Sequence, residues 1–256
     1  MSRRAPRRFT VIAPLVVIVC LVFFWWAITA FSGIQAWRLP SPYAVLARGY
    51  SLVQQPSLWL AFVRTGVEAL VGGFIGVCVA LPLSYLIFRF RTIAEAIEPL
   101  LGTSQALPAV ALATFLVLWF GYGLIPISML CALIAFFPIL ISSLVGLRSL
   151  DRQVCEAAQL DGAAGITMAV KIEIPLASPA ILAGIRNGFT LSITGAVVGE
   201  MVMGGKGLGM LLSQMRTNVD TAGMFVVILL LCIQAVVIYT LMSAWEKRSR
   251  VMVETD

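Results

Sequence analysis

Few residues of this sequence are suited to carry out chemistry, and their types exclude most catalytic sites. The 256-residue chain contains no His, which excludes imidazole acid–base catalysis and imidazole metal ligands. None of the 5 Cys stands at a metal-like spacing and no disulfide framework suggests itself, so we interpret them as small packing residues. No Asp lies in an apolar stretch, and no nucleophile stands at a spacing that would pair it with a base. An intramembrane enzyme is therefore a weak hypothesis.

A glycine-rich run with one lysine, residues 204–209, invites comparison with a phosphate-binding loop. That loop follows the pattern G-x-x-x-x-G-K-[ST]. Here Glu200 stands where the first Gly belongs, and Gly207 replaces the hydroxyl residue. We therefore expect the run to turn the chain at a membrane edge. Since no other nucleotide-binding pattern occurs in the sequence, we expect this chain to bind no cofactor.

The apolar stretch 176–199 carries two sets of residues on neighbouring helix faces. Small residues recur every three or four positions and predict close helix packing; they are Gly184, Gly188, Ser192, Gly195 and Gly199. A polar flank consists of Arg186, Asn187, Thr190 and Thr194. Such groups either line a solute path or bond across helices and to their own backbone. Glu200 falls near the outer face of the membrane that this stretch would cross. There it could act as a gate or pair with Arg186 or Lys206.

A polar stretch at residues 156–175 offers a different kind of site, a surface for another protein. Its sequence, EAAQLDGAAGITMAVKIEIP, predicts a short helix over 154–160, a helix end at Gly162 and a second helix over 163–173. Pro175 lacks an N–H and should end the second helix. A helical hairpin with a small-residue face suits docking into a groove of another protein. An ordinary loop is equally compatible with these residues.

This stretch resembles the EAA motif of ABC-importer permeases. The motif reads EAA, three residues, G, nine residues and I-x-L-P, and it falls on Glu156, Ala157, Ala158, Gly162, Ile172 and Pro175. Ile174 stands where the family usually has Leu, a volume-conserving change. The resemblance implies that the hairpin is a coupling helix. Such a helix sits in a cleft of a separate ATPase subunit and passes its motion to the membrane helices.

Long apolar helices must position these residues. With 60% hydrophobic and 12% charged residues, the chain is predicted to be an all-α polytopic membrane protein. Runs long enough for a hydrocarbon core of about 30 Å predict six spans, at residues 11–31, 62–88, 100–120, 124–147, 176–199 and 222–245. In the second of these, Arg64 and Glu68 could pair, and Gly72 and Gly76 permit close helix approach.

The chain is thus predicted to divide into four parts. The first is a basic N-terminus with one helix, 1–31, and the second is an extracytoplasmic connection, 32–61, with interfacial aromatic residues. A five-helix core of the MetI-like importer type, 62–247, contains the hairpin within 151–175. A tail, 248–256, follows. The N-terminal helix is an addition to the core that the resemblance covers, roughly residues 60–245.

The distribution of basic residues predicts the orientation in the membrane. Five Lys and Arg fall on one side of the six spans: Arg38, Arg48, Arg64, Lys206 and Arg216. Twelve fall on the other: Arg3, Arg4, Arg7, Arg8, Arg89, Arg91, Arg148, Arg152, Lys171, Lys247, Arg248 and Arg250. The positive-inside rule places the second side, with both termini and the hairpin, in the cytoplasm. The resemblance implies that the membrane is the inner membrane of a bacterium. Because these basic residues stand beside apolar segments, no nucleic-acid partner is expected.

The resemblance implies the partners and the function. Six helices line only half a pathway, so a second copy of this chain is expected. Two ATP-binding cassette subunits would bind ATP and Mg, and an extracytoplasmic solute-binding protein would deliver the solute. An ion-gradient-driven secondary transporter or channel is the alternative hypothesis. It needs ionisable groups in the membrane interior, where Arg186 and the edge residues Glu68 and Glu200 are the few available.

The solute is predicted from a more local resemblance. Leu107-Pro108, the run WFGYG at 119–123, Gly199-Glu200-Met201 and Gly207-Leu208-Gly209 are similar to permeases for nitrate, sulfonates and taurine. Ala109 departs from that pattern, which tends to have a second Pro. A small anion is therefore expected, although related permeases also serve pyrimidine-type vitamin precursors.

Overall fold

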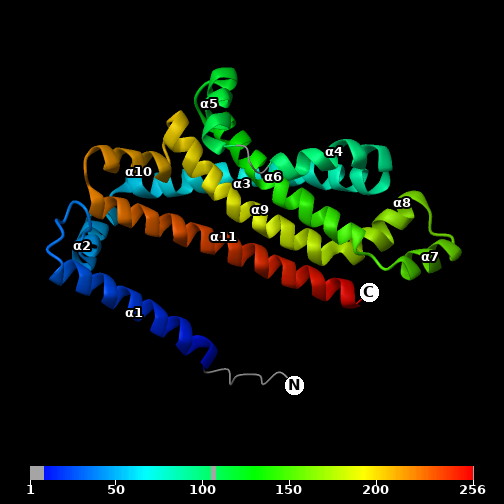
Figure 1. Ribbon diagram of the computed structural model, residues 1–256, viewed down its shortest axis with the longest axis horizontal. Helices are drawn as coiled ribbons and strands as arrows, with labels where there is room; N and C mark the ends of the chain where they lie inside the picture. The colour runs from blue at the N-terminus through cyan, green and yellow to red at the C-terminus, as the bar shows by residue number, and fades with distance from the viewer. Residues whose placement is uncertain (1–8, 105–107, 256) are drawn as a thin grey trace. The chain divides into compact units, whose positions relative to one another are not determined.

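The structure is a computed structural model that describes residues 9–104 and 108–255 (Figure 1). Within these residues every regular element is helical, which confirms the all-α prediction. The elements are α1 (Phe9–Phe31), α2 (Pro42–Val53), α3 (Pro56–Arg89), α4 (Arg91–Ser104), α5 (Ala109–Phe120), α6 (Leu124–Arg148), α7 (Arg152–Leu160), α8 (Gly165–Met168), the π-helical turn η1 (Ala169–Glu173), α9 (Ile174–Met203), α10 (Leu208–Thr217) and α11 (Thr221–Thr255).

The chain forms two compact units. The first, here called the N-terminal unit, comprises the chain up to Trp59 together with Leu212–Leu229. Within it, Arg48 of α2 forms an ion pair with Asp220, with its Nη2 2.6 Å from Oδ2. The Trp25 ring of α1 stacks on Phe225 at a centroid distance of 5.4 Å. The start of α11 therefore packs with the helices that precede the core in sequence.

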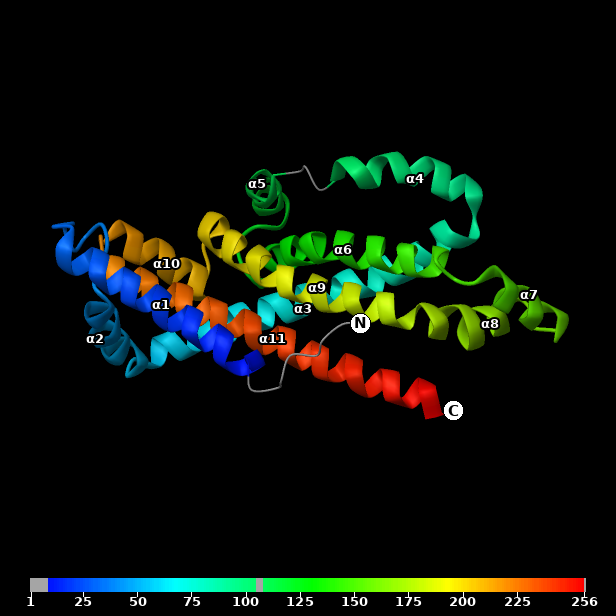
Figure 2. The same ribbon diagram turned by 60° about the horizontal axis from the view of Figure 1, so that its bottom comes forward.

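The second unit, here called the core unit, comprises Leu60–Leu211 and the chain from Leu230 onward. Its centre is the pair α6 and α9, which lie side by side in both views (Figures 1 and 2). Leu130, Ile139 and Leu140 of α6 are fully buried, and Ile185 and Phe189 of α9 are buried in the same cluster.

Glycines allow the helices of the core unit to approach this closely. A Cβ on Gly188 of α9 would lie 2.6 Å from Ile139 Cγ1, and one on Gly195 would lie 2.9 Å from the Cα of Cys131. A Cβ on Gly72 of α3 would lie 2.5 Å from the backbone oxygen of Ser128. The structure confirms that the glycines of α3 and α9 serve helix packing, as their spacing predicted.

Four helical segments among the described residues are long and apolar enough to cross a membrane: Pro56–Arg89, Leu124–Arg148, Gly165–Met203 and Thr221–Arg248. They correspond to the second, fourth, fifth and sixth predicted spans. Two shorter apolar helices, Val16–Phe31 and Ala109–Phe120, stand where the first and third were expected.

The third predicted span, 100–120, is wrong as a single helix. α4 covers residues up to Ser104, and α5 begins only at Ala109. Pro108, at the N-cap of α5, has an extended backbone with φ −68° and ψ 117°. A proline lacks the N–H of a continuous helix and disfavours helical geometry in the residue before it, which explains a new start here. The predicted Leu107 lies outside the described residues.

The prediction that a helix ends at Pro175 is also wrong. The chain is helical without interruption from Gly165 to Met203. The N–H of Ile174 bonds to the carbonyl oxygen of Ala169, five residues back, which makes the turn before Pro175 a π turn. The wider turn changes which carbonyl each N–H reaches, so the helix continues past a residue that has no N–H.

Close packing at Gly72 predicts a stability effect. Gly72→Ala should destabilise the protein by about 1–3 kcal/mol, because the methyl group would press on the backbone of α6. Gly102→Ala is the matched control, since nothing lies within 4 Å of a Cβ at that position. The melting temperature in detergent checks this: it should fall for Gly72→Ala and stay for Gly102→Ala. Equal melting temperatures would contradict the packing role.

Candidate functional site

The hairpin begins with a well-capped helix. The side chain of Asp151 accepts the backbone N–H of Gln153 at the start of α7. At its end, the N–H of Gly162 bonds to Gln159 O at 3.0 Å and the N–H of Ala163 bonds to Ala158 O at 2.9 Å. These two bonds define a Schellman motif. Gly162 has φ +89°, which confirms the predicted helix end.

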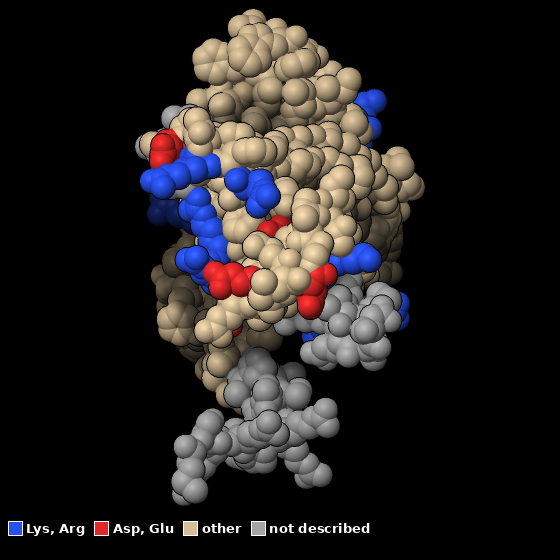
Figure 3. All heavy atoms as spheres, turned by 90° about the vertical axis from the view of Figure 1, so that its right-hand side faces the viewer, with Lys and Arg blue, Asp and Glu red and all other residues tan. Residues whose placement is uncertain are grey.

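The hairpin exposes apolar side chains on α7 and α8. Leu160 is 89% exposed and Ile166 is 82% exposed, and no residue of α7 is buried. Glu156 forms an ion pair with Arg152, whose Nε lies 2.7 Å from Oε1, while Ala157 and Ala158 leave the helix without bulk. Lys, Arg, Asp and Glu side chains gather at the end of the molecule that faces the viewer in Figure 3.

The thiol of Cys155 in this hairpin lies among carboxylates that favour its neutral form. Burial raises the pKa of Cys155, and the carboxylates of Glu173, Asp151 and Glu156 raise it further. The neutral thiol is the stable form, and only the thiolate is nucleophilic. Among the described residues, no group of three or more Cys, Asp or Glu could hold a metal ion, so nothing here points to a metal centre.

The hairpin joins the membrane helices through η1. Ile172 and Pro175 of the motif are both half-buried at this junction. Between them Glu173 is 5% exposed, and its Oε2 accepts a hydrogen bond of 2.8 Å from the hydroxyl of Tyr85 on α3. Neither Tyr85 nor Glu173 was predicted as a functional residue, and an acidic residue inside the motif was the only available signal.

The polar flank of α9 divides between two surroundings. Arg186 forms an ion pair with Glu246 of α11, with Nη1 2.9 Å from Oε2, and it lies over the Tyr239 ring. The hydroxyl of Thr190 donates to the backbone oxygen of Arg186, four residues earlier in the same helix. Asn187 and Thr194, in contrast, are exposed. The four residues share one helix, but only Asn187 and Thr194 of the four are exposed in the single chain.

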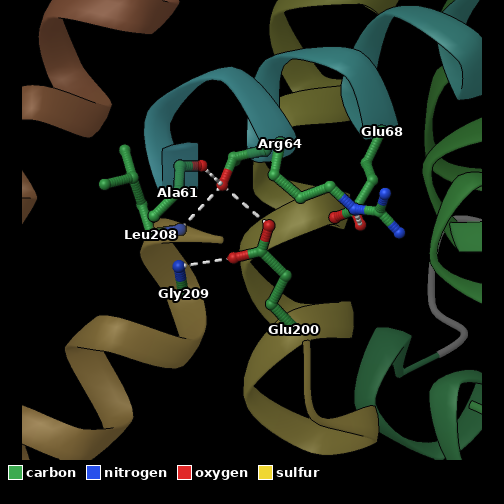
Figure 4. Close-up of polar contacts among 7 residues, drawn as sticks. Ala61, Arg64, Glu68, Glu200, Leu208 and Gly209 are labelled. Carbon is green, nitrogen blue, oxygen red and sulfur yellow. Dashed lines mark hydrogen bonds and ion pairs between the residues drawn. The ribbon is translucent and has the colours of Figure 1, made fainter. Parts of the chain in front are cut away.

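Glu200 is fully buried between Thr65 and the glycines Gly205, Gly207 and Gly209, a cluster here called the cage (Figure 4). Its Oε1 accepts the hydroxyl of Thr65 at 2.7 Å, and its Oε2 accepts the N–H of Gly209 at 2.5 Å. The Thr65 oxygen in turn accepts the N–H of Leu208 at 2.8 Å. A side chain on Gly207 would collide with Glu200 Oε1 and with Thr65.

This arrangement caps α10 from two other helices. The first N–H groups of a helix lack partners within the helix and favour a negative group. Glu200 from α9 and Thr65 from α3 supply acceptors for the N–H groups of Gly209 and Leu208 at the start of α10. The expected pairing of Glu200 with Arg186 or Lys206 is therefore wrong in this structure, and a gating role stays a prediction. The sequence predicted neither the role of Thr65 nor the helix α10, because no local pattern connects Thr65 with a residue 143 positions away.

Arg64 and Glu68 form the predicted ion pair beside this cage, with Nε 2.8 Å from Oε1. Glu68 is fully buried, and its other oxygen has no hydrogen-bond partner in the described structure. A pocket of about 500 Å³ opens next to the pair and is lined also by Tyr122 and Lys206. One of the two basic groups at this pocket is already neutralised, so the pocket is only weakly suited to an anion.

The cage predicts a structural role for Thr65. Thr65→Val keeps the shape of the side chain but leaves Glu200 and the Leu208 N–H each one bond short. Each loss should cost about 1–3 kcal/mol. The melting temperature in detergent should therefore fall. Thr240→Val is the matched control, because the exposed Thr240 hydroxyl bonds only to its own helix at Val236 and Val237. An unchanged melting temperature for Thr65→Val would show that the cage does not hold α10.

Comparisons with known proteins agree with this architecture. In fold, the chain is similar to a chain in an inward-facing structure of the MetNI methionine ABC transporter, with a TM-score of 0.69 and 18% identity over 75% of this chain and 95% of that one. It is likewise similar to a chain of an amino acid ABC transporter, with a TM-score of 0.64 and 17% identity over 78% of this chain and 97% of that one. At these identities the likeness shows the fold.

Three proteins related by sequence are more similar to this chain in identity than these two structures are. The riboflavin transport system permease protein RibX of Chloroflexus aurantiacus is 38% identical over 91% of this chain and 87% of its own length. The formylaminopyrimidine transport permease protein ThiX of Halalkalibacterium halodurans is 30% identical over 88% and 89%. The putative aliphatic sulfonates transport permease protein SsuC of Escherichia coli is 28% identical over 86% and 83%.

A family model agrees with the relatives and with the fold. The model described as "Binding-protein-dependent transport system inner membrane component" matches residues 72–251, well over half of the chain. The match covers the hairpin, the glycine-packed pair α6 and α9, and Glu200 with the start of α10, whereas Thr65 lies before its first residue. The chain therefore belongs to the family of inner membrane components of binding-protein-dependent transport systems.

Proposed function

We propose that this chain forms half of the solute pathway of an ABC importer and transmits the work of a separate ATPase through its hairpin. The family consists of ABC-importer permeases, which are membrane subunits and not the catalytic ones. ATP and Mg are bound by the partner ATPase. The observation that carries the coupling role is the hairpin surface, with Leu160 exposed at the end of the capped α7 and Ile166 exposed at the start of α8.

Exposed apolar side chains of this kind need a partner. A surface that faces water and presents Leu160 and Ile166 beside the small Ala157 fits a helix-in-groove contact. The Schellman motif at Gly162 and the cap at Asp151 fix the hairpin before it binds, which lowers the conformational entropy lost on docking. Two ATPase subunits, one for each permease copy, are the proposed occupants.

The exposed face of α9 is the proposed lining of the pathway. Asn187, Leu191 and Thr194 lie three or four residues apart, and all three are exposed in the single chain. Two copies facing each other along α9 would enclose these side chains between them. Arg186, Thr190 and Glu200 would act behind this surface, since Arg186 Nη1, the Thr190 hydroxyl and the Glu200 carboxyl group are bonded within the chain.

The orientation is proposed from charge. The hairpin end carries many charged side chains (Figure 3), and the basic residues expected on the cytoplasmic side outnumber those on the other. Both termini and the hairpin would then face the cytoplasm, and an extracytoplasmic binding protein would meet the opposite end.

The relatives and the charges together favour a heterocyclic vitamin-type solute over the small anion expected from local resemblance. The named relatives with 38% and 30% identity are permeases for riboflavin and formylaminopyrimidine, whereas the sulfonate permease is 28% identical. Arg64 and Arg186, which would suit an anion, are both neutralised by carboxylates. A sulfonate-type anion is the second candidate, because the sulfonate permease also matches over most of this chain.

Docking through the hairpin predicts that one exposed leucine holds the ATPase. Leu160→Glu should remove the native ATPase subunit from the purified complex, because a charge would replace an apolar contact. Leu46→Glu is the matched control, since Leu46 on α2 is also exposed, at 73%. A tagged chain is solubilised in mild detergent and the co-purifying ATPase is quantified.

Retention of the ATPase by Leu160→Glu would contradict the docking surface. A wild-type preparation without any ATPase, in which ion gradients alone drive flux, would favour a secondary transporter instead.

The solute proposal predicts an order of uptake. Cells that lack their own importers and express the complete system should accumulate labelled riboflavin or formylaminopyrimidine and not taurine. The reason is that Arg64 and Arg186 are already paired with carboxylates. A system without this chain is the control. Taurine uptake alone would contradict the heterocycle and support the anion.

A further inference from the structure

One hydrogen bond joins the root of the hairpin to a different membrane helix. The hydroxyl of Tyr85 on α3 donates to Glu173 Oε2 at 2.8 Å, across 88 residues of sequence. Tyr85 lies one turn before the end of α3 at Arg89, and Glu173 is the last residue of η1. The bond therefore connects α3 with the short segment through which the hairpin continues into α9.

Glu173 is held in this position by burial as well as by the bond. The residue is 5% exposed, and a carboxylate with so little access to water depends strongly on its protein donors. The tyrosine hydroxyl is such a donor, and its ring is half-buried against Phe88, with centroids 6.2 Å apart. A movement of Glu173 must therefore either carry Tyr85 with it or break the bond.

The backbone at Glu173 is suited to movement. η1 is a single π turn between α8 and α9, and Pro175 follows two residues later without an N–H to complete the ladder. A π turn can return to α-helical bonding by a one-residue change of partners, which rotates everything before it relative to everything after it. Before it stands the hairpin, with Gly162 and Gly165 at positive φ; after it stands α9.

α3 runs from Pro56 to Arg89, and Pro82, which lacks an N–H for the helical ladder, lies inside it three residues before Tyr85. The helix packs on the central pair through Gly72 against α6 and through Gly73 against Phe189 of α9. We propose that Tyr85 is a positioning residue that makes α3 follow the hairpin when the ATPase moves it. The proposal rests on the proposed function, because it needs an ATPase that displaces the hairpin.

The test uses the complete importer with its native ATPase in lipid nanodiscs and needs no solute. One spin label per chain replaces Gln153 on the hairpin, and in a second preparation it replaces Leu60 of α3, which is 71% exposed. The native cysteines are replaced first. Distances between the labels of the two copies are measured without nucleotide and with ATP and vanadate.

In the wild type, ATP with vanadate should shift the distance for both label positions. In Tyr85→Phe the distance between the two hairpin labels should still shift. The fraction of complexes in which the distance between the two labels at position 60 shifts should fall at least about fivefold. Glu173→Ala should act in the same way, and the double variant should be no worse than either single one. Glu173→Gln keeps an acceptor oxygen and should follow the wild type. Tyr50→Phe, an exposed tyrosine on α2, is the matched control.

The outcomes separate this proposal from the proposed function. A Leu60 pair that shifts in Tyr85→Phe as in the wild type would overturn the role of Tyr85. Loss of the hairpin shift in Tyr85→Phe would overturn it as well, because the residue would then shape the hairpin and not the connection to α3. A wild-type importer in which neither pair responds to nucleotide would instead contradict the coupling function itself.

Discussion

The close approach of α3, α6 and α9 is the constraint on which the rest of the core unit depends. In lipid there is little hydrophobic drive between helices, so stability comes from backbone contact and dispersion forces. Glycines on α9 and α3 leave no Cβ at the points where α6 passes, at Ile139 and Cys131 for example. The three helices therefore have little freedom to slide past one another. Polar groups at both ends of this rigid packing can then be held at fixed distances.

Two polar contacts use that rigidity, one toward each end of α3. Thr65 of α3 meets Glu200 of α9 and caps α10. Tyr85, about five and a half turns later on the same helix, meets Glu173 at the root of the hairpin. A single helix thus contacts the segments on both sides of α9. Among the described residues, these contacts make α3 the link between the loop after α9 and the hairpin before it.

The sequence predicted those parts of the structure that have a local pattern. The apolar runs located α6, α9 and α11, and glycine spacing predicted how α9 packs. The positive φ at Gly162 and the Arg64–Glu68 pair followed from neighbouring residues. In contrast, Thr65 and Tyr85 have partners 135 and 88 residues away, and no periodicity reveals such a distance. The error at Pro175 has a different origin: proline ends most helices, but a π turn before it allows this one to continue.

The length of the helical segment Gly165–Met203 has a consequence for the lipid headgroups. Its 39 residues extend for about 58 Å, whereas a bilayer with its headgroup layers is about 40–45 Å thick. If Met203 lies at the outer boundary, the other end clears the inner headgroups by about 15 Å. The hairpin then stands in bulk water beyond the phosphate layer. A partner can reach Leu160 and Ile166 there without displacing any lipid.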